Sequence, residues 1–278
     1  MRIAIIADIH SNIYALKEAY KYIDRSNIDK IVVLGDLISD CPYPNRVMEF
    51  LYKWSERKEL VFIKGNREEY LLDFDDTDEL KENMESIKYT YDNLDKKYLN
   101  EFMKYSYTHE EKIEGKTLFF SHASKNNTRD LLYPNENNTK QYMDSLDADI
   151  IFCAHSHLQF IYYYNNKILV NPGTIGHFRE NKKTANFSIL EVTENKTEIK
   201  EISIPYETKE LLKDFTESGL EKIGGPYIAS LIYAYKTGVF FGSSMLSLGK
   251  ELGGNKEDYD KAYRILVKRY NNGKRQVI

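Results

Sequence analysis

Seven side chains that can bind a metal ion follow short apolar runs in this sequence. They are Asp8, His10, Asp36, Asn66, His122, His155 and His157. Nitrogen and oxygen donors together suit divalent ions such as Mn, Fe, Zn or Ni better than Ca or Mg alone. Seven donors exceed what one tetrahedral ion needs, so the set favours two ions that share a bridging carboxylate.

Each of these short motifs has an ordinary structural explanation when taken alone. A lone Asp-x-His, Gly-Asp or Gly-Asn is often a turn or a helix cap. A His-x-His that follows a buried strand is a more specific sign of a metal site. Five such elements at the ends of five successive apolar runs are hard to explain as turns, so we predict a metal centre.

The apolar runs predict the elements that must position these side chains. They cover residues 3–7, 31–34, 61–63, 118–120 and 150–152. Runs that are apolar on both faces are typical of strands inside an α/β protein. Helical spacing between the first two runs, and again over 44–54, predicts parallel strands with right-handed crossovers. Because ligands bind at the carboxyl ends of such strands, the polar residues should gather along one edge.

The rest of the chain divides by composition. Residues 68–114 hold 15 acidic and 6 basic residues with helical periodicity, which predicts an inserted helical segment. Residues 167–171, 185–192 and 197–204 are expected to be strands that form a second sheet. The pattern is helical from 206 onward, and residues 261–278 carry six Lys or Arg and no acid.

Composition and charge exclude several classes of protein. The 278 residues include 43 acidic and 39 basic ones, and the net charge of −4 gives no general attraction to nucleic acid. The acidic segment 68–114 would also oppose a long polyanion such as duplex DNA. Residues 227–249 have Lys236 as their one charge, but Gly, Ser and Thr interrupt them, which predicts two buried helices instead of a membrane span.

Cysteine usage predicts an intracellular setting. Cys41 and Cys153 cannot build a disulfide framework, and the first apolar run is too short for a signal peptide because it meets Asp8 at once. We therefore expect a cytoplasmic protein in which both cysteines are packing residues.

The motifs in order resemble those of the calcineurin-like metallophosphoesterases. The matching segments are Asp8-x-His10, Gly35-Asp36, Gly65-Asn66, Ser121-His122 and Ala154-His155-Ser156-His157. The segment Asn-Pro-Gly-Thr-Ile-Gly at 171–176 is similar to the compact prokaryotic branch of that family. The resemblance covers about residues 1–205. It implies a four-layer α/β/β/α sandwich around two mixed sheets. To this the composition adds a helical insertion at about 68–114 and a helical C-terminal extension over 206–278.

The resemblance also implies how the ligands are divided. One ion would be held by Asp8, His10, Asp36 and His157. The second would be held by Asp36, Asn66, His122 and His155, with Asp36 as the bridge. We expect Mn²⁺ first, with Fe, Zn or Ni as alternatives. The implied reaction is in-line attack of a bridging hydroxide on a phosphodiester or phosphoanhydride bond, with the catalytic residues Asp36, Asn66, Arg67 and His122.

Two residues depart from the family pattern. Arg67 stands where the family usually has His, and Ala154 stands where it usually has Gly. Arginine can bind phosphate oxygens in a bidentate way, but it does not titrate and is a poor general acid. We therefore predict a preference for good leaving groups. The alternative for Arg67 is an ion pair with Glu68, Glu69 or Asp73, away from substrate. Alanine at 154 costs little if its φ is negative.

Several further residues are candidates for binding substrate. Asn12 could donate to a substrate oxygen, although capping the following helix is its more ordinary role. Gly173 and Thr174 could form a turn near the metals, or a plain turn between strands. We interpret His177 as a surface residue, with contact to substrate as the alternative.

The predicted partner is a small phosphorylated substrate such as a nucleotide, with no duplex nucleic acid and no membrane; the pattern indicates no particular oligomeric state. Two other functions are compatible with the sequence. The helical tail has a weak similarity to asymmetric diadenosine tetraphosphate hydrolases of the same branch. A non-catalytic scaffold on the same fold is the alternative from a different class, although such scaffolds typically lose ligands and all seven are present here.

Overall fold

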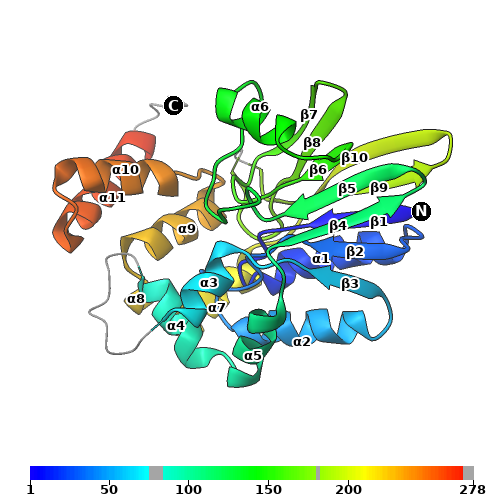
Figure 1. Ribbon diagram of the computed structural model, residues 1–278. Coiled ribbons are helices and arrows are strands. Elements are labelled where there is room, and N and C mark those ends of the chain that lie inside the picture. The colour runs from blue at the N-terminus through cyan, green and yellow to red at the C-terminus, as the bar shows by residue number, and fades with distance from the viewer. Residues whose placement is uncertain (75–83, 180–181, 272–278) are drawn as a thin grey trace.

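Two stacked five-stranded sheets form the centre of the computed structural model, which describes residues 1–74, 84–179 and 182–271 (Figure 1). The first sheet has the strand order β10 (Lys196–Pro205), β9 (Thr184–Thr193), β1 (Arg2–Ile6), β2 (Lys30–Val33) and β3 (Glu59–Phe62). The second has the order β4 (Thr108–Ile113), β5 (Lys116–Ser121), β6 (Ile150–Phe152), β8 (Lys167–Pro172) and β7 (Gln159–Tyr164).

The five predicted runs form five of the six described strands that pair in parallel, and β8 is the sixth. β1 pairs parallel with β2, and β2 with β3, across the crossover helices α1 (Ile13–Asp24) and α2 (Pro44–Ser55). In the second sheet β5, β6 and β8 are parallel to one another. This confirms the predicted parallel pairing and brings the carboxyl ends of the strands to one side of the molecule.

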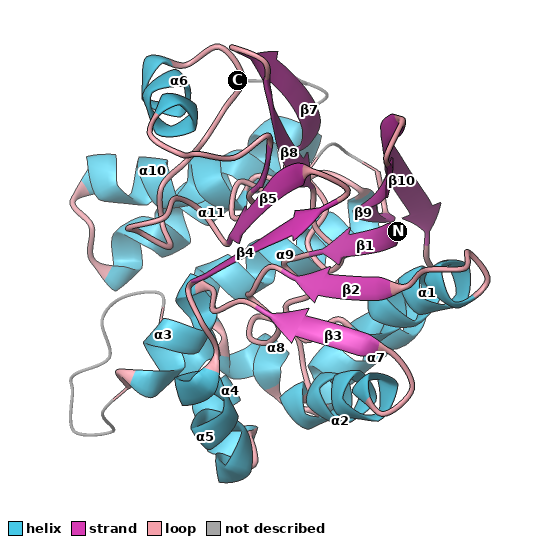
Figure 2. Cartoon of the chain, turned by 45° about the vertical axis from the view of Figure 1, so that its right-hand side comes forward, coloured by secondary structure: helices cyan, strands magenta, loops and turns pink. Residues whose placement is uncertain are grey.

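Apolar faces of the strands produce the layers. Alternate side chains of β1 and β5, such as Ile5 and Phe120, are buried in a core between the two sheets. The opposite face of the first sheet packs against α1 and α2, as with Leu16 and Leu51. Helix α6 (Asn137–Asp144) covers the outer face of the second sheet through Met143. Figure 2 shows α1 and α2 beneath the first sheet and α6 on the far side of the second, which confirms the four-layer sandwich.

The segment predicted as a helical insertion is helical over α3 (Asn66–Leu72), α4 (Glu85–Asn93) and α5 (Lys96–Lys104). Residues 75–83 of it lie outside the described residues. The prediction is wrong at the C-terminal end, because residues 108–113 form strand β4. A tight turn at Glu114 and Gly115, both with positive φ, closes an antiparallel hairpin with β5. The charged side chains of this segment suit an edge strand.

The three late strands do not form a sheet of their own. Strand β8 joins the second sheet, whereas β9 and β10 join the first, where β9 pairs antiparallel with β1. The sequence pattern identified the strands but not their partners. The chain passes from one sheet to the other at residues 173–176, where the Ile175 amide donates to the carbonyl of Ala7 at 3.0 Å.

The C-terminal extension is helical, as predicted. It contains α7 (Lys209–Glu217), α8 (Leu220–Ile223), α9 (Gly225–Thr237), α10 (Gly242–Leu252) and α11 (Lys256–Asn271). Figure 1 shows α9, α10 and α11 beside the carboxyl ends of the parallel strands, opposite the N-terminus. Gly238 ends α9 with a positive φ, so residues 227–249 are a broken helix pair. Within the described ranges, no helix is long and apolar enough to cross a membrane. The last residues of the predicted basic segment, 272–278, lie outside the described part.

Candidate active site

All seven predicted metal ligands lie in or directly after the loops at the carboxyl ends of the parallel strands. Five of them have a backbone in the left-handed region, with φ between 49° and 60°: Asp8, His10, Asp36, His155 and His157. A non-glycine residue rarely adopts this region, and each such residue costs roughly 1–3 kcal/mol. Such strain persists where the surrounding structure enforces it, and it clusters at functional sites. The backbone is therefore bent to bring these side chains together.

Asp36 lies at the centre of the site, between two groups of ligands. Its Oδ2 atom is 3.7 Å from Nε2 of His10, and its Oδ1 atom is 3.6 Å from Nε2 of His122. Asp8, His10 and Asp36 form one group of close donor atoms, and Asp36, His122 and His155 form another. The two groups share Asp36, as the prediction of a bridging carboxylate requires.

Asp8 provides a direct test of whether the site fits cations. Both of its carboxylate oxygens are buried, and neither has a hydrogen-bond partner among the described residues. Burial alone would raise the pKa of Asp8, but His157, His122 and His10 hold it well below its usual range, so the carboxylate is ionised. A buried anion without donors is costly unless a cation accompanies it. These oxygens are therefore suited to a metal ion.

The imidazole rings present nitrogen donors to the same space. His10 Nε2 and His157 Nε2 are 3.3 Å apart, and His157 Nε2 is 3.3 Å from Oδ1 of Asp8. Burial lowers the pKa of His157, and burial together with the neighbouring His122 lowers that of His155 to about 4. Both rings are therefore neutral near pH 7, which is the form that binds metals.

His122 is oriented by a contact behind its ring. The carbonyl of Leu34 accepts a hydrogen bond from His122 Nδ1 at 2.6 Å, so the proton lies on Nδ1. His122 Nε2 then faces Oδ1 of Asn66 at 3.1 Å. A carbonyl on the rear nitrogen is the usual way to fix the tautomer of a ligating histidine.

Glu68 holds the loops that carry Asp36 and Asn66, a role that sequence reasoning missed. The buried carboxylate accepts hydrogen bonds from the amides of Gly65, Asp36 and Leu37 at 2.8–2.9 Å. It thereby ties the loop after β2 to the start of α3. Its position three residues after Gly65 is the signal that could have indicated this, since an acid there typically bonds back to the first amide of a helix.

Arg67 points into the site and not toward the acids that follow it in sequence. Its Nη2 atom is 3.0 Å from Oδ2 of Asp40, and its Nε atom is 4.0 Å from Oδ2 of Asp36. Glu68 bonds to backbone amides, and Glu69 pairs with Arg129 at 2.9 Å. The predicted alternative, an ion pair with the acids next in sequence, is therefore wrong, since the partner is Asp40. The Arg67 side chain is 18% exposed, so a substrate can reach it.

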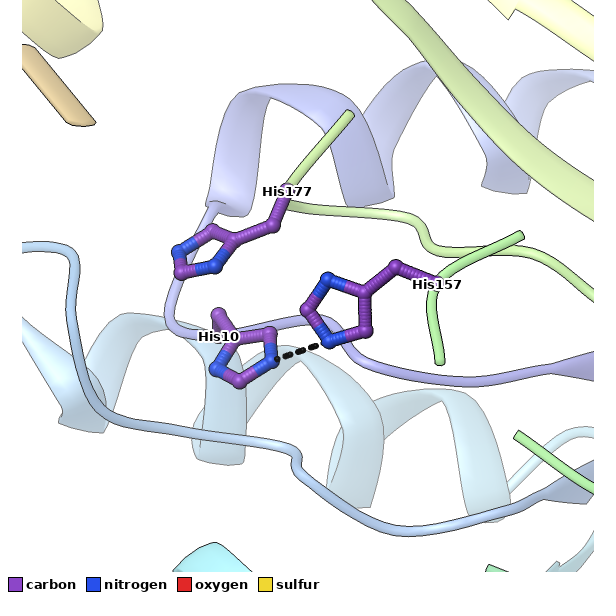
Figure 3. Close-up of side chains that lie close together, drawn as sticks. All are labelled: His10, His157 and His177. Carbon is purple, nitrogen blue, oxygen red and sulfur yellow. Dashed lines mark hydrogen bonds between the residues drawn. The ribbon is translucent and has the colours of Figure 1, made fainter. Parts of the chain in front are cut away.

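His177 is not the surface residue that was predicted. It is 2% exposed, and its ring stacks on that of His10 with centroids 4.0 Å apart. Figure 3 shows His177, His10 and His157 together, and donor atoms of the three lie within 4.8 Å of one another. The sequence predicted a turn at 171–176 but not that this turn folds onto the end of β1, where the Gly176 amide donates to the Asp8 carbonyl.

Two of the residues predicted to bind substrate make structural contacts within the fold. Asn12 caps α1 by accepting from the Ala15 amide, and its side-chain NH₂ donates to the Gly176 carbonyl. The Thr174 hydroxyl donates to the Asp8 carbonyl and accepts from the His177 amide, both at 2.9 Å. Asn12 and Thr174 are fully buried, and the cap made by Asn12 agrees with the more ordinary role expected for it; contact of either residue with substrate stays a prediction.

Gly173 is a buried turn residue with φ of 79°. A Cβ there would lie 2.9 Å from the Cβ of Asn186, which explains the glycine. Ala154 does not have a positive φ, so its methyl group is accommodated in the core between the sheets. Cys41 and Cys153 are free and buried, in agreement with the packing role predicted for them.

This fold and this buried set of aspartates and histidines define a metal-dependent phosphoesterase. The family model of the calcineurin-like phosphoesterase superfamily domain matches residues 1–195, and the chain belongs to that superfamily. A protein of Methanocaldococcus jannaschii described as uncharacterised is 27% identical over 238 residues, which are 78% of this chain and 93% of that protein.

Two solved structures are similar in fold. A hypothetical protein of Pyrococcus horikoshii has a TM-score of 0.73 at 21% identity, and the match covers 86% of this chain and 99% of the other. A metallophosphoesterase of Sphaerobacter thermophilus has a TM-score of 0.69 at 19% identity, with the same coverage. Both agree with the mixed α/β fold of two sheets flanked by helices.

Proposed function

We propose that this chain is a dinuclear phosphoesterase that hydrolyses phosphodiester or phosphoanhydride bonds of a small, nucleotide-sized substrate. The observation that carries the proposal is the position of Asp36, whose two oxygens face His10 on one side and His122 on the other. A carboxylate between two donor groups is what two neighbouring dications require of a bridge.

The residues divide between the two ions as the family resemblance implies. Asp8, His10, Asp36 and His157 would hold one ion, and Asp36, Asn66, His122 and His155 would hold the other. Such ions, of which Mn²⁺ is our first choice and Fe, Zn or Ni the alternatives, would activate water near neutral pH and offset the charge of the phosphate. The oxygens of Asp8 support this assignment because neither accepts a hydrogen bond from a described residue.

Arg67 is the residue proposed to bind the substrate phosphate. Its Nε atom lies 4.0 Å from Oδ2 of Asp36, and the Arg67 side chain as a whole is 18% exposed. A guanidinium can donate two parallel hydrogen bonds to phosphate oxygens and stabilise the charge that develops on them. It cannot protonate the leaving group. We therefore expect turnover of aryl phosphodiesters and phosphoanhydrides, and poor turnover of alkyl esters.

The test is a leaving-group series on the Mn-loaded protein. Phenyl phosphodiesters with leaving-group pKa values spread over several units should give kcat/KM values that fall steeply as that pKa rises. Chelation or Asp36→Ala should abolish turnover. A rate that is insensitive to leaving-group pKa would contradict the role proposed for Arg67. Silence of the loaded protein toward esters and anhydrides would contradict the proposed function as a whole.

A narrower alternative is asymmetric hydrolysis of diadenosine tetraphosphate, whose polyphosphate chain needs a second cation beside Arg67. Arg179 is the candidate, because it follows the buried His177 by two residues and donates from Nη2 to the Ser243 hydroxyl at 2.9 Å. Under this alternative Arg179→Met should raise KM for dinucleoside polyphosphates at least tenfold more than for aryl phosphodiesters, about 1.4 kcal/mol. Equal effects would contradict it.

A further inference from the structure

Asp40 is a buried carboxylate that contacts two functional residues at once. Its Oδ2 atom lies 3.2 Å from Nδ1 of His10 and 3.0 Å from Nη2 of Arg67. The hydroxyl of Ser86, on α4, donates to its Oδ1 atom at 2.7 Å. Asp40 itself is 0% exposed. One oxygen therefore joins a predicted metal ligand to the proposed phosphate-binding residue, while the other is anchored to the helical insertion.

The contact with His10 bears on metal binding. His10 turns Nε2 toward Asp8, Asp36 and His157, and turns Nδ1 toward Asp40. A carboxylate behind a ligating histidine keeps the proton on the rear nitrogen and makes the front nitrogen a better donor. Loss of such a partner typically costs 10- to 100-fold in metal affinity.

The contact with Arg67 bears on both metal and substrate. Among the described carboxylates, Asp36 is the other one within ion-pair distance of Arg67, at 4.0 Å. If Asp40 lost its charge, the guanidinium would turn toward Asp36 and compete with the ions for that bridge. Asp40 thus keeps a cation away from the carboxylate that two dications must share.

We propose that Asp40 is a positioning residue that couples the two halves of the site: it orients His10 for metal binding and holds Arg67 beside Asp36 without letting it pair there. This inference rests on the proposed function of Arg67. It assigns Asp40 a role that requires no contact with substrate. The resulting interaction between positions 40 and 67 can be measured without any turnover.

The experiment is a double-variant cycle of Asp40→Asn and Arg67→Met, with Mn²⁺ and Zn²⁺ affinities measured by calorimetry on the full chain. Asp40→Asn should weaken binding 10- to 100-fold. Arg67→Met alone should leave the affinity unchanged or tighten it. The double variant should bind metal more tightly than Asp40→Asn, because the competing guanidinium is gone. Wild-type affinity in Asp40→Asn, or equal affinities in the single and double variants, would overturn the proposal.

Asp214→Asn is the matched control. Asp214 is also a buried carboxylate, bonded to Arg46 and to the Tyr14 hydroxyl at 2.8 Å each, but it lies on α7. It should change stability without changing metal affinity. If Asp40→Asn does not fold, Ser86→Ala is used in its place. This change removes the hydrogen bond from Ser86 to Asp40 and keeps the negative charge of Asp40. Ser86→Ala should weaken metal binding about two- to fivefold, roughly the effect of one hydrogen bond, and no change would overturn the proposal.

Kinetics separate this inference from the proposed function. With bis(p-nitrophenyl) phosphate at saturating Mn²⁺, Asp40→Asn should raise KM as Arg67→Met does, and the two effects should not add. Additive effects would overturn the coupling while leaving the phosphoesterase intact. If the wild-type protein were inactive, the proposed function would be contradicted. The metal affinities would still test the contact between Asp40 and His10.

Discussion

The ring of His177 lies flat against the ring of His10, with a centroid distance of 4.0 Å and planes only 9° from parallel. Because the two rings lie face to face, His177 presents the face of its imidazole to His10. His177 therefore supports the His10 ring by covering its face. Together with Asp40 at Nδ1, it restricts the orientation of this ligand.

We predict that His177→Phe retains metal affinity within about twofold, whereas His177→Ala weakens it. A phenyl ring preserves the stacking, and a face contact of this kind is worth about 0.5–1.5 kcal/mol, or about two- to tenfold in affinity. Titration of both variants with Zn²⁺ measures this. Equal losses in the two variants would mean that a nitrogen of His177 binds the ion directly.

Gly65→Ala should disrupt the metal centre by a purely steric route. A Cβ at Gly65 would lie 2.5 Å from the amide nitrogen of Asp36 and would also collide with Oδ1 of the same residue. We expect Asp36 to be displaced, with at least a hundredfold loss of kcat/KM and a destabilisation of about 1–3 kcal/mol. Assays of activity and urea unfolding on the same preparation check both effects.

Gly115→Ala is the control for that change. Gly115 has φ of 77° in the hairpin between β4 and β5, and a Cβ there meets nothing within 4 Å. Strain alone should cost about 1–2 kcal/mol of stability and leave kcat/KM unchanged. If Gly65→Ala and Gly115→Ala lost equal activity, general destabilisation would be the cause and not the collision with Asp36.

The metal-free protein should lose stability on acidification through His155. Its pKa of about 4 in the folded chain lies below the unfolded value of 6.5. The unfolded chain therefore binds more protons between these values, so this contribution is complete above pH 6.5 and is lost as the pH falls toward 4. Between pH 7.5 and 5 the loss is about 2 kcal/mol.

Urea unfolding in the presence of a chelator, for wild type and His155→Gln, measures this contribution. The difference in unfolding free energy between the two proteins should shrink by that amount at pH 5. Glu68 acts in the opposite direction, because burial raises its pKa to about 7, but it is present in both proteins and cancels. A difference that stays constant with pH would contradict a neutral, buried His155.

Arg67→His should change which substrates the enzyme accepts. An imidazole can donate a proton to a leaving group, whereas a guanidinium cannot. We expect kcat/KM for alkyl phosphodiesters to rise at least tenfold relative to aryl phosphodiesters, with a shallower dependence on leaving-group pKa. Arg67→Lys is the matched control. It keeps the positive charge at position 67 but does not supply a general acid that titrates near neutral pH, so it should not show this selective gain.

The sequence alone predicted the family, the four layers and the convergence of seven candidate ligands at one edge of the sheets. It could do so because each ligand follows a buried strand directly, and the carboxyl ends of parallel strands must converge at one edge. Asp36 is an example. It lies in the loop directly after β2, so the end of that strand places it at the edge where the other ligands gather. Local pattern and topology are sufficient for residues of this kind.

Only the tertiary structure decided the contacts made by residues distant in sequence. Asp40 follows Asp36 by four positions, but nothing in the spacing indicates that it pairs with Arg67 or lies behind His10. His177 was wrongly predicted to lie on the surface, and the strand partner of β9 was not predicted. Both depend on the crossing of the chain from β8 to the first sheet, which is set by long-range pairing. Side-chain partners form between surfaces that meet only after the sheets stack, so no local pattern encodes them.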